Sequence, residues 1–258
     1  MSSSKTSSRQ TVDALRQQLQ GVEAKRAVHR ERPISSGCPA LDRLLPEGGF
    51  PRGSLIECLG EGPHAGGAGM FAMMIARQAA LEDGVIVVFD DQDRFYPPGA
   101  AGLGVELDRV VIVRARRDDD RIWALDQALR CLAVAAVWAP VEHLDERSFR
   151  RLQLAAEEGG GLGLLVRSRR WRQHPSWAPV RLLIAPRALD SRQSRRGRCL
   201  RIEVVRCRRG KNRGGVDVEV DLGTASMQQV SDQHETDTLH SASQLADPAT
   251  RGRPAQAQ

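Results

Sequence analysis

Residues 54–69 read SLIECLGEGPHAGGAG, and this stretch decides the fold class. A short apolar run at 54–59 leads into a glycine-rich loop, and a helical pattern without a breaker follows at 70–81. A strand, a glycine loop and a helix in this order form the context in which the phosphate-binding motif GxxxxGK[ST] occurs. The sequence therefore predicts an α/β domain built around a phosphate-type loop.

This loop has the spacing of the motif but lacks its chemistry. Ala68 takes the position of the lysine that neutralises the β and γ phosphates, and Gly69 takes that of the hydroxyl that holds magnesium. We therefore expect no catalytic residue, no metal and no cofactor, with weak ATP binding left open. The degenerate phosphate loop comprises Gly62, Gly66, Gly67, Ala68 and Gly69.

A second acidic site is also missing. The apolar run 134–140, VAAVWAP, ends in Trp, Ala and Pro where a nucleotide hydrolase of this kind needs a magnesium-coordinating carboxylate. Asp90, Asp91 and Asp93 follow the run GVIVVF at 84–89, but Gln92 falls where a water-activating glutamate would belong. Without a metal or phosphate, such aspartates are more often loop and helix-capping residues.

The remaining core alternates between strands and helices. Apolar runs at 84–89, 110–113, 133–138, 162–166 and 180–185 are typical of buried strands, and amphipathic patterns at 119–132 and 145–158 predict helices. Two longer alternating segments, 199–207 and 216–222, flank a loop and predict a hairpin. The expected fold is a mostly parallel sheet with helices on both faces and a C-terminal antiparallel hairpin.

The two ends of the chain differ from this core, which we place at 31–223. Residues 1–10 and 224–258 contain almost no large apolar side chains, so we expect disordered tails. Residues 11–30 form a predicted helix that packs on its own domain or docks on a second subunit or partner. Its apolar positions are Val12, Leu15, Leu19 and Val22.

No apolar run approaches the roughly 20 residues of a membrane span. Residues 1–10 also lack the apolar segment of a secretory signal. These features predict a cytoplasmic protein that does not contact membranes.

Charge is distributed unevenly along the chain. The 38 basic and 32 acidic residues give +6, yet residues 167–213 alone hold 16 basic and two acidic residues. This basic segment indicates an anionic partner, either single-stranded nucleic acid or an acidic protein, with a solvated surface as the alternative. Arginines beside an aromatic ring suit single-stranded nucleic acid. The candidate contacts are Arg167, Arg169, Arg170, Trp171, Arg172, Arg206, Arg208, Arg209 and Lys211.

A family resemblance lies in the segments that lead into the loop. Residues 34–45, ISSGCPALDRLL, and 48–57, GGFPRGSLIE, resemble the I-S-T-G-x-x-x-L-D-x-L-L and G-G-x-P-x-G-x-x-x-E lead of RecA and RadA recombinases. The lost lysine and the segments RRLQLAAE (150–157) and LGLLVR (162–167) resemble the ImuA family of RecA-like accessory proteins, distant relatives of SulA. The resemblance extends to about residue 222 and implies a RecA-like core.

The same resemblance implies a function. ImuA proteins act in the SOS response to DNA damage, with the Y-family-like protein ImuB and an error-prone DnaE-type polymerase, in translesion synthesis and induced mutagenesis. RecA itself is a further candidate partner, and in RecA proteins the loop after the strand at 162–166 contacts DNA. Two alternatives remain: an active RecA-like DNA-dependent ATPase in recombinational repair, and a SulA-like inhibitor of cell division.

Overall fold

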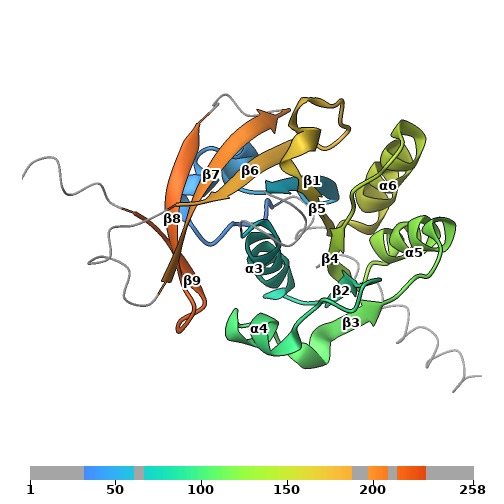
Figure 1. Cartoon of the computed structure of the whole chain (residues 1–258), viewed down its shortest axis with the longest axis horizontal. Coiled ribbons are helices and arrows are strands. Elements are labelled where there is room, and N and C mark those ends of the chain that lie inside the picture. Colours follow the sequence, from blue (N-terminus) through green and yellow to red (C-terminus); the bar gives the residue numbers. More distant parts are fainter. Residues whose placement is uncertain (1–31, 61–66, 188–196, 209–213, 231–258) are drawn as a thin grey trace, which may run out of the picture.

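The described part of the chain is organised around one sheet (Figure 1). The computed structural model describes residues 32–60, 67–187, 197–208 and 214–230, and within them nine strands run in the order β3-β2-β4-β5-β1-β6-β7-β8-β9. The first six strands in this order are parallel, and β7, β8 and β9 are added antiparallel, which confirms the predicted sheet and its C-terminal hairpin. The strands are β1 (Ser54–Gly60), β2 (Val85–Phe89), β3 (Val110–Val113), β4 (Val134–Pro140), β5 (Leu162–Ser168), β6 (Val180–Pro186), β7 (Gly197–Cys207), β8 (Gly215–Asp221) and β9 (Ser226–Gln229).

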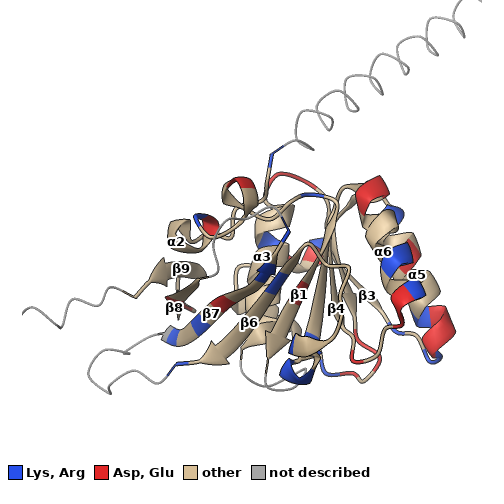
Figure 2. Cartoon of the chain, turned by 90° about the horizontal axis from the view of Figure 1, so that it is seen from above, with Lys and Arg blue, Asp and Glu red and all other residues tan. Residues whose placement is uncertain are grey.

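Helices cover both faces of the sheet, as the sequence predicts (Figure 2). Successive side chains of a strand point to opposite faces, so Ile56 packs with Phe71 of α3 while Leu55 packs with Leu125 of α5 and Leu152 of α6. The helices are α2 (Pro39–Asp42), α3 (Ala68–Ala80), α4 (Pro97–Gly102), α5 (Asp118–Arg130) and α6 (Glu146–Gly159), with 3-10 turns η1 (Pro46–Gly48), η2 (Leu107–Arg109) and η3 (Arg169–Gln173).

Local signals set the bounds of α6. The Asp145 side chain accepts a hydrogen bond from the Ser148 backbone N–H, so it caps the first turn. Gly160 ends the helix in the left-handed region, at φ 80°, where glycine is favoured over other residues. Both ends agree with the predicted helix at 145–158.

The expectation that the C-terminal tail begins at 224 is wrong for its first residues. Strand β9 pairs antiparallel with β8, and Met227 is buried in the α3-side core. One buried methionine and the main-chain hydrogen bonds hold this strand, and its other residues are polar, so the sequence shows no apolar alternation there. Residues 231–258, the predicted tail at 1–10 and the predicted helix at 11–30, with Val12, Leu15, Leu19 and Val22, lie outside the described residues.

Among the residues that the structure describes, no helix is long and apolar enough to span a bilayer.

Candidate functional site

The start of α3 lies where a phosphate loop would present its ligands. Gly67 precedes the helix in the left-handed region, at φ 82°, and Ala68 is completely buried in the α3-side core. The methyl group of Ala68 therefore packs into the protein core. Gly62 and Gly66 lie outside the described residues.

A tryptophan on β4 contacts this first turn of α3. The indole Nε1 of Trp138 donates a hydrogen bond to the carbonyl oxygen of Gly69, with 3.1 Å between the two atoms. The ring is buried and lies 6.4 Å, centroid to centroid, from the ring of Phe95. The end of β4 thus supplies an apolar ring and a neutral donor at the place where a nucleotide hydrolase needs a carboxylate for magnesium.

The C-terminal hairpin also packs against the first turn of α3. Leu200 of β7 is buried with Ala68 and Trp138 in one core. A Cβ atom added to Gly67 would lie 2.6 Å from Cδ2 of Leu200, so the leucine side chain would have to move, and the φ of 82° would strain any other residue. Glycine at position 67 therefore permits close packing of β7 against the start of α3.

The aspartates after β2 form hydrogen bonds and ion pairs that stabilise the loop that contains them. Asp90 is buried and accepts hydrogen bonds from the backbone N–H groups of Arg94 (2.7 Å) and Phe95 (3.1 Å). Asp91 accepts from the Ala115 N–H at 2.9 Å and pairs with Nε of Arg121 at 3.0 Å. These contacts confirm the interpretation of Asp90 and Asp91 as loop residues.

Asp93 and Gln92 complete that loop. Asp93 pairs with Nη2 of Arg114 at 2.6 Å and has a positive φ of 55°. Gln92 is exposed. Within the described ranges, no group of three or more His, Cys, Asp or Glu side chains has the arrangement of a metal site.

The basic segment begins with an arginine that is buried and therefore cannot reach a nucleic acid or a partner protein. Arg167 is 2% exposed, and its guanidinium is ion-paired with the completely buried Glu57 of β1. It also donates to the carbonyl oxygens of Val141 and Glu142, each at 3.2 Å. The expectation that Arg167 meets a nucleic acid or partner is therefore wrong, because strand alternation directs it into the protein beside Glu57.

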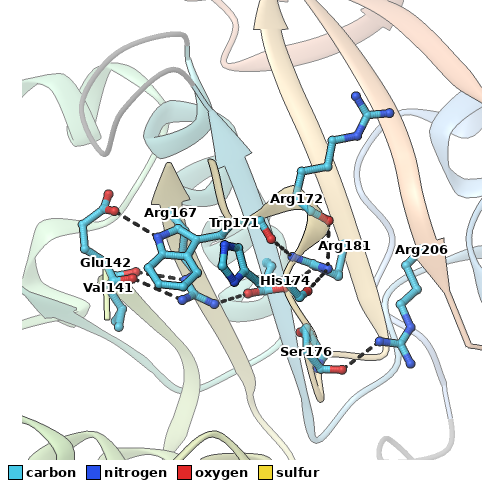
Figure 3. Close-up of polar contacts among 11 residues, drawn as sticks. Val141, Glu142, Arg167, Trp171, Arg172, His174, Ser176, Arg181 and Arg206 are labelled. Atoms are coloured by element: carbon cyan, nitrogen blue, oxygen red, sulfur yellow. Dashed lines mark hydrogen bonds and ion pairs between the residues drawn. The ribbon is translucent and has the colours of Figure 1, made fainter. Parts of the chain in front are cut away.

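A second buried arginine completes this cluster (Figure 3). Arg181 of β6 is 4% exposed, and its Nε lies 2.5 Å from Oε2 of Glu57. Its guanidinium donates to the carbonyl oxygens of Trp171 (2.5 Å), Arg172 (3.2 Å) and His174 (2.9 Å). Burial lowers the pKa of Arg181, while the Glu57 carboxylate opposes that shift. One buried acid and two buried arginines thus hold the η3 turn in place.

Sequence reasoning missed Arg181 and the role of Glu57. The available signal was a charge inside each of two otherwise apolar strands, SLIECLG and VRLLIAP. Buried charges are normally paired, so the two strands were candidates for neighbours.

The tryptophan of η3 is already engaged within the protein. Trp171 is half-buried, and its Nε1 donates to Oε2 of Glu142 at 3.2 Å. The guanidinium carbon of Arg167 lies 4.6 Å from its ring centroid, and the rings of His143 and His174 lie 5.1 and 4.7 Å away. These contacts explain why Trp171 is a poor candidate for the base-stacking that its sequence context predicts.

The other candidate arginines that the structure describes lie in the connection 169–179 or contact it. Arg206 donates from Nη1 to the Ser176 carbonyl oxygen at 2.7 Å, and the Arg208 backbone N–H donates to Pro179 at 2.9 Å. The exposed guanidinium of Arg208 lies 5.5 Å from the ring centroid of Trp177. Arg169, Arg170 and Arg172 of η3 are also exposed. Arg209 and Lys211 lie outside the described residues.

Similarities to known proteins agree with this architecture. Residues 18–138 match the family model of the RecA N-terminal domain. The chain is 34% identical over 140 residues to Protein ImuA of Caulobacter vibrioides, which covers 53% of this chain and 57% of that protein. These two matches support an ImuA/RecA-like family for this chain.

Other similarities of this chain cover shorter parts of it or concern the fold alone. It is 34% identical over 90 residues to Protein RecA of Streptococcus pyogenes, which covers 35% of this chain and 23% of that RecA. The chain thus spans about half the length of the ImuA proteins that it matches, and less of RecA. The crystal structure of the RadB recombinase aligns with a TM-score of 0.57 and 15% identity, over 77% of this chain and 100% of that chain. That likeness shows a RecA-like fold.

Proposed function

We propose that this chain is a RecA-like accessory protein of the DNA-damage response that does not hydrolyse ATP. In this proposal it acts with an ImuB-type protein and an error-prone DnaE-type polymerase in translesion synthesis and induced mutagenesis. The observation that carries the proposal is the hydrogen bond from Trp138 to the carbonyl oxygen of Gly69. The similarity to ImuA supports the same role.

The chemistry of phosphate binding explains why that contact matters. The triphosphate of ATP carries several negative charges, which ATPases neutralise with a lysine and a magnesium ion held by a hydroxyl and a carboxylate. Ala68 and Gly69 begin α3, and Trp138 of β4 and Leu200 of β7 pack near them; none of these four residues is charged. Hydrolysis at this position would lack both the metal ligand and the cation.

An assay of phosphate release tests the non-catalytic part. The purified chain is incubated with ATP, magnesium and single-stranded DNA, alongside a RecA protein as the positive control. We expect no release above the protein-free blank. Release that depends on DNA and is lost in Asp91→Asn would overturn the proposal and support an ATPase.

A genetic experiment tests the biological part. Deleting the gene is expected to abolish ultraviolet-induced mutagenesis, and a plasmid copy is expected to restore it. Induced mutation at the wild-type frequency in the deletion strain would contradict a role in translesion synthesis.

We also propose that exposed arginines of the basic segment contact single-stranded DNA. The group comprises Arg169, Arg170, Arg172 and Arg208. The buried cluster of Glu57 and Arg181 supports this proposal, because two η3 carbonyls and that of His174, all bonded to one guanidinium, keep the turn from rearranging. Binding through phosphates would weaken with salt, with a log-log slope of about −0.7 per contact. Affinity that does not change between low and high salt would rule out such contacts.

A further inference from the structure

The connection between β5 and β6 ends near a tryptophan that two arginines contact. Trp177 is half-buried, and it packs against the core that α5 and α6 cover. The guanidinium carbons of Arg150, on α6, and Arg208, just after β7, lie 4.9 and 5.5 Å from its ring centroid. An aromatic ring and two cations from separate elements therefore meet near the amino end of β6.

The indole of Trp177 is less engaged than that of Trp171. Among the hydrogen bonds between described residues, none involves Nε1 of Trp177, whereas Nε1 of Trp171 donates to Glu142. Trp171 also contacts the Arg167 guanidinium and two histidine rings. Stacking on a base requires an accessible aromatic face. Of the two tryptophans in this connection, Trp177 is therefore the better candidate for that role.

A hollow of about 350 Å³ lies at the amino ends of β1 and β6, and Trp177 lines it. Arg208 lines it as well, so the cation beside the ring also faces the hollow. Four prolines supply further apolar lining: Pro33, Pro46, Pro51 and Pro179. Ligand pockets range from about 300 to 1,000 Å³, so this small one matches a single planar ring system such as a base.

Both signs of charge are present in the lining, which contains Arg32, Arg52, Arg208, Glu47 and Glu157. Arg52 is already paired with Glu82 at 2.8 Å. Arg32 and Arg208 form no ion pair within the part of the chain that the structure describes. A free phosphate or an acidic peptide does not suit this lining, because the two carboxylates would repel it. A nucleotide suits it better, since its base is uncharged, the amino groups of the base donate to carboxylates, and its phosphate pairs with arginine.

The η3 arginines lie at the other end of the same connection. Arg172 and Trp177 are five positions apart, so their Cα atoms are separated by at most about 18 Å. The chain between them is held to the sheet, because Arg206 of β7 donates to the Ser176 carbonyl oxygen at 2.7 Å (Figure 3). The hollow is therefore within reach of a short single strand that contacts the η3 arginines.

We propose that this hollow accepts one unstacked base of single-stranded DNA. The base stacks on Trp177 and donates from its amino group to Glu47 or Glu157. The adjoining phosphate pairs with Arg32 or Arg208. The inference rests on the proposed contact of the exposed arginines with single-stranded DNA, and it adds a contact to a base where that proposal involves phosphates alone.

Two labelled single strands of equal length test the proposal, one of deoxycytidines and one abasic, because both carry the same phosphates. Fluorescence anisotropy measures their affinities for the full chain, for Trp177→Ala and for Trp123→Ala. Trp123 is the matched control, since it is 61% exposed and lies on α5, outside the lining. We expect the wild type and the control to bind the cytosine strand about ten-fold more tightly than the abasic strand. We expect Trp177→Ala to bind both strands equally, at the affinity of the wild type for the abasic strand.

Photocrosslinking keeps the test independent of the folding of a variant. A strand with 5-iodocytosine, which reacts with aromatic side chains on irradiation, is crosslinked to the wild-type chain, and mass spectrometry locates the modified peptide. We expect the crosslink at Trp177. A crosslink at Trp171 or Trp123 in its place would overturn the proposal. Thermal unfolding is measured for both variants, and the crosslink decides if Trp177→Ala fails to fold.

The outcomes separate this inference from the proposal on which it rests. Equal wild-type affinity for the two strands, with weaker binding in Arg172→Ala, would overturn the base site and leave the phosphate contacts standing. No binding of either strand by the wild type would contradict both. A preference for the cytosine strand that persists in Trp177→Ala would also overturn the base site, because the base would then be bound elsewhere.

Discussion

The indole Nε1 of Trp138 donates to the carbonyl oxygen of Gly69 across 3.1 Å, and this contact joins the end of β4 to the first turn of α3. In an open α/β sheet, the carboxyl ends of the strands are where ligands bind. Here the contact, together with the packing of Leu200 near Gly67, makes part of that edge a continuation of the hydrophobic core. The position of the missing lysine is thus surrounded by apolar side chains of the core.

Restoring the motif residues alone should not restore nucleotide binding. Ala68→Lys/Gly69→Thr places a long charged side chain at a completely buried position, so we expect a loss of about 1–3 kcal/mol in unfolding free energy. We also expect no rise in melting temperature with millimolar ATP and magnesium. Differential scanning fluorimetry checks both, and an ATP-dependent rise would show that these apolar surroundings still admit phosphate.

Removing the charge of Glu57 should destabilise the whole core. Glu57→Gln leaves Arg167 and Arg181 buried without their counter-charge, and breaking such a buried pair costs about 3–5 kcal/mol. Glu106→Gln is the control, because its pair with Arg109 is exposed and worth about 0–1 kcal/mol. Urea unfolding measures both. Equal losses in the two variants would argue against a structural role for the cluster.

Arginines of the basic segment should divide into surface and buried classes. Arg172→Ala and Arg208→Ala are each expected to weaken binding of single-stranded DNA and to reduce the salt slope by about 0.7 per lost phosphate contact. Arg167→Ala should instead lower the melting temperature, because that side chain is buried against Glu57. Fluorescence anisotropy at several salt concentrations distinguishes the two classes. A smaller salt slope in a folded Arg167→Ala protein would contradict this division.

The cysteines should differ sharply in reactivity. Burial, with a smaller contribution from the Glu57 carboxylate, raises the pKa of the Cys58 thiol to about 12, so it carries almost no thiolate at pH 8. Cys131 is exposed. Maleimide is expected to label Cys131 within minutes, and Cys58 only after unfolding in guanidinium. Mass spectrometry of peptides reads out the result, and rapid labelling of Cys58 in the folded protein would contradict the burial.

Acid should weaken the ion pairs that Asp126 of α5 forms with Arg130 of its own helix and Arg151 of α6. The pKa of this group is lower in the folded protein than its ordinary value of 3.8, so its ion pairs contribute stability above pH 4. That contribution is lost as pH falls through the lowered pKa. Asp126→Asn should therefore be less stable than wild type at pH 6, with a difference that shrinks toward pH 2. A difference that stays constant with pH would exclude the charge as its cause.

Much of the fold could be predicted because it depends on local patterns. The run GVIVVF predicts a buried strand, the glycine after α6 predicts the end of that helix, and the alternation in β8 predicts a strand with one buried face. Each of these patterns lies within a few neighbouring residues. Strand β9 could not be predicted, because its stability comes from pairing with β8 and from the single buried side chain of Met227. The candidate site was harder to predict than the fold, because nothing in the sequence distinguishes the buried Arg167 from the exposed arginines that follow it.

By itself, the sequence determined that the chain is α/β, that its phosphate loop lacks lysine and hydroxyl, and that its basic charge gathers in one segment. These properties depend on which residues follow one another. Only the tertiary structure decided which arginines face water, that Glu57 neutralises two of them, and that Trp138 bonds to Gly69. Those outcomes depend on strand register and sheet order, which bring together residues about 70 to 125 positions apart along the chain.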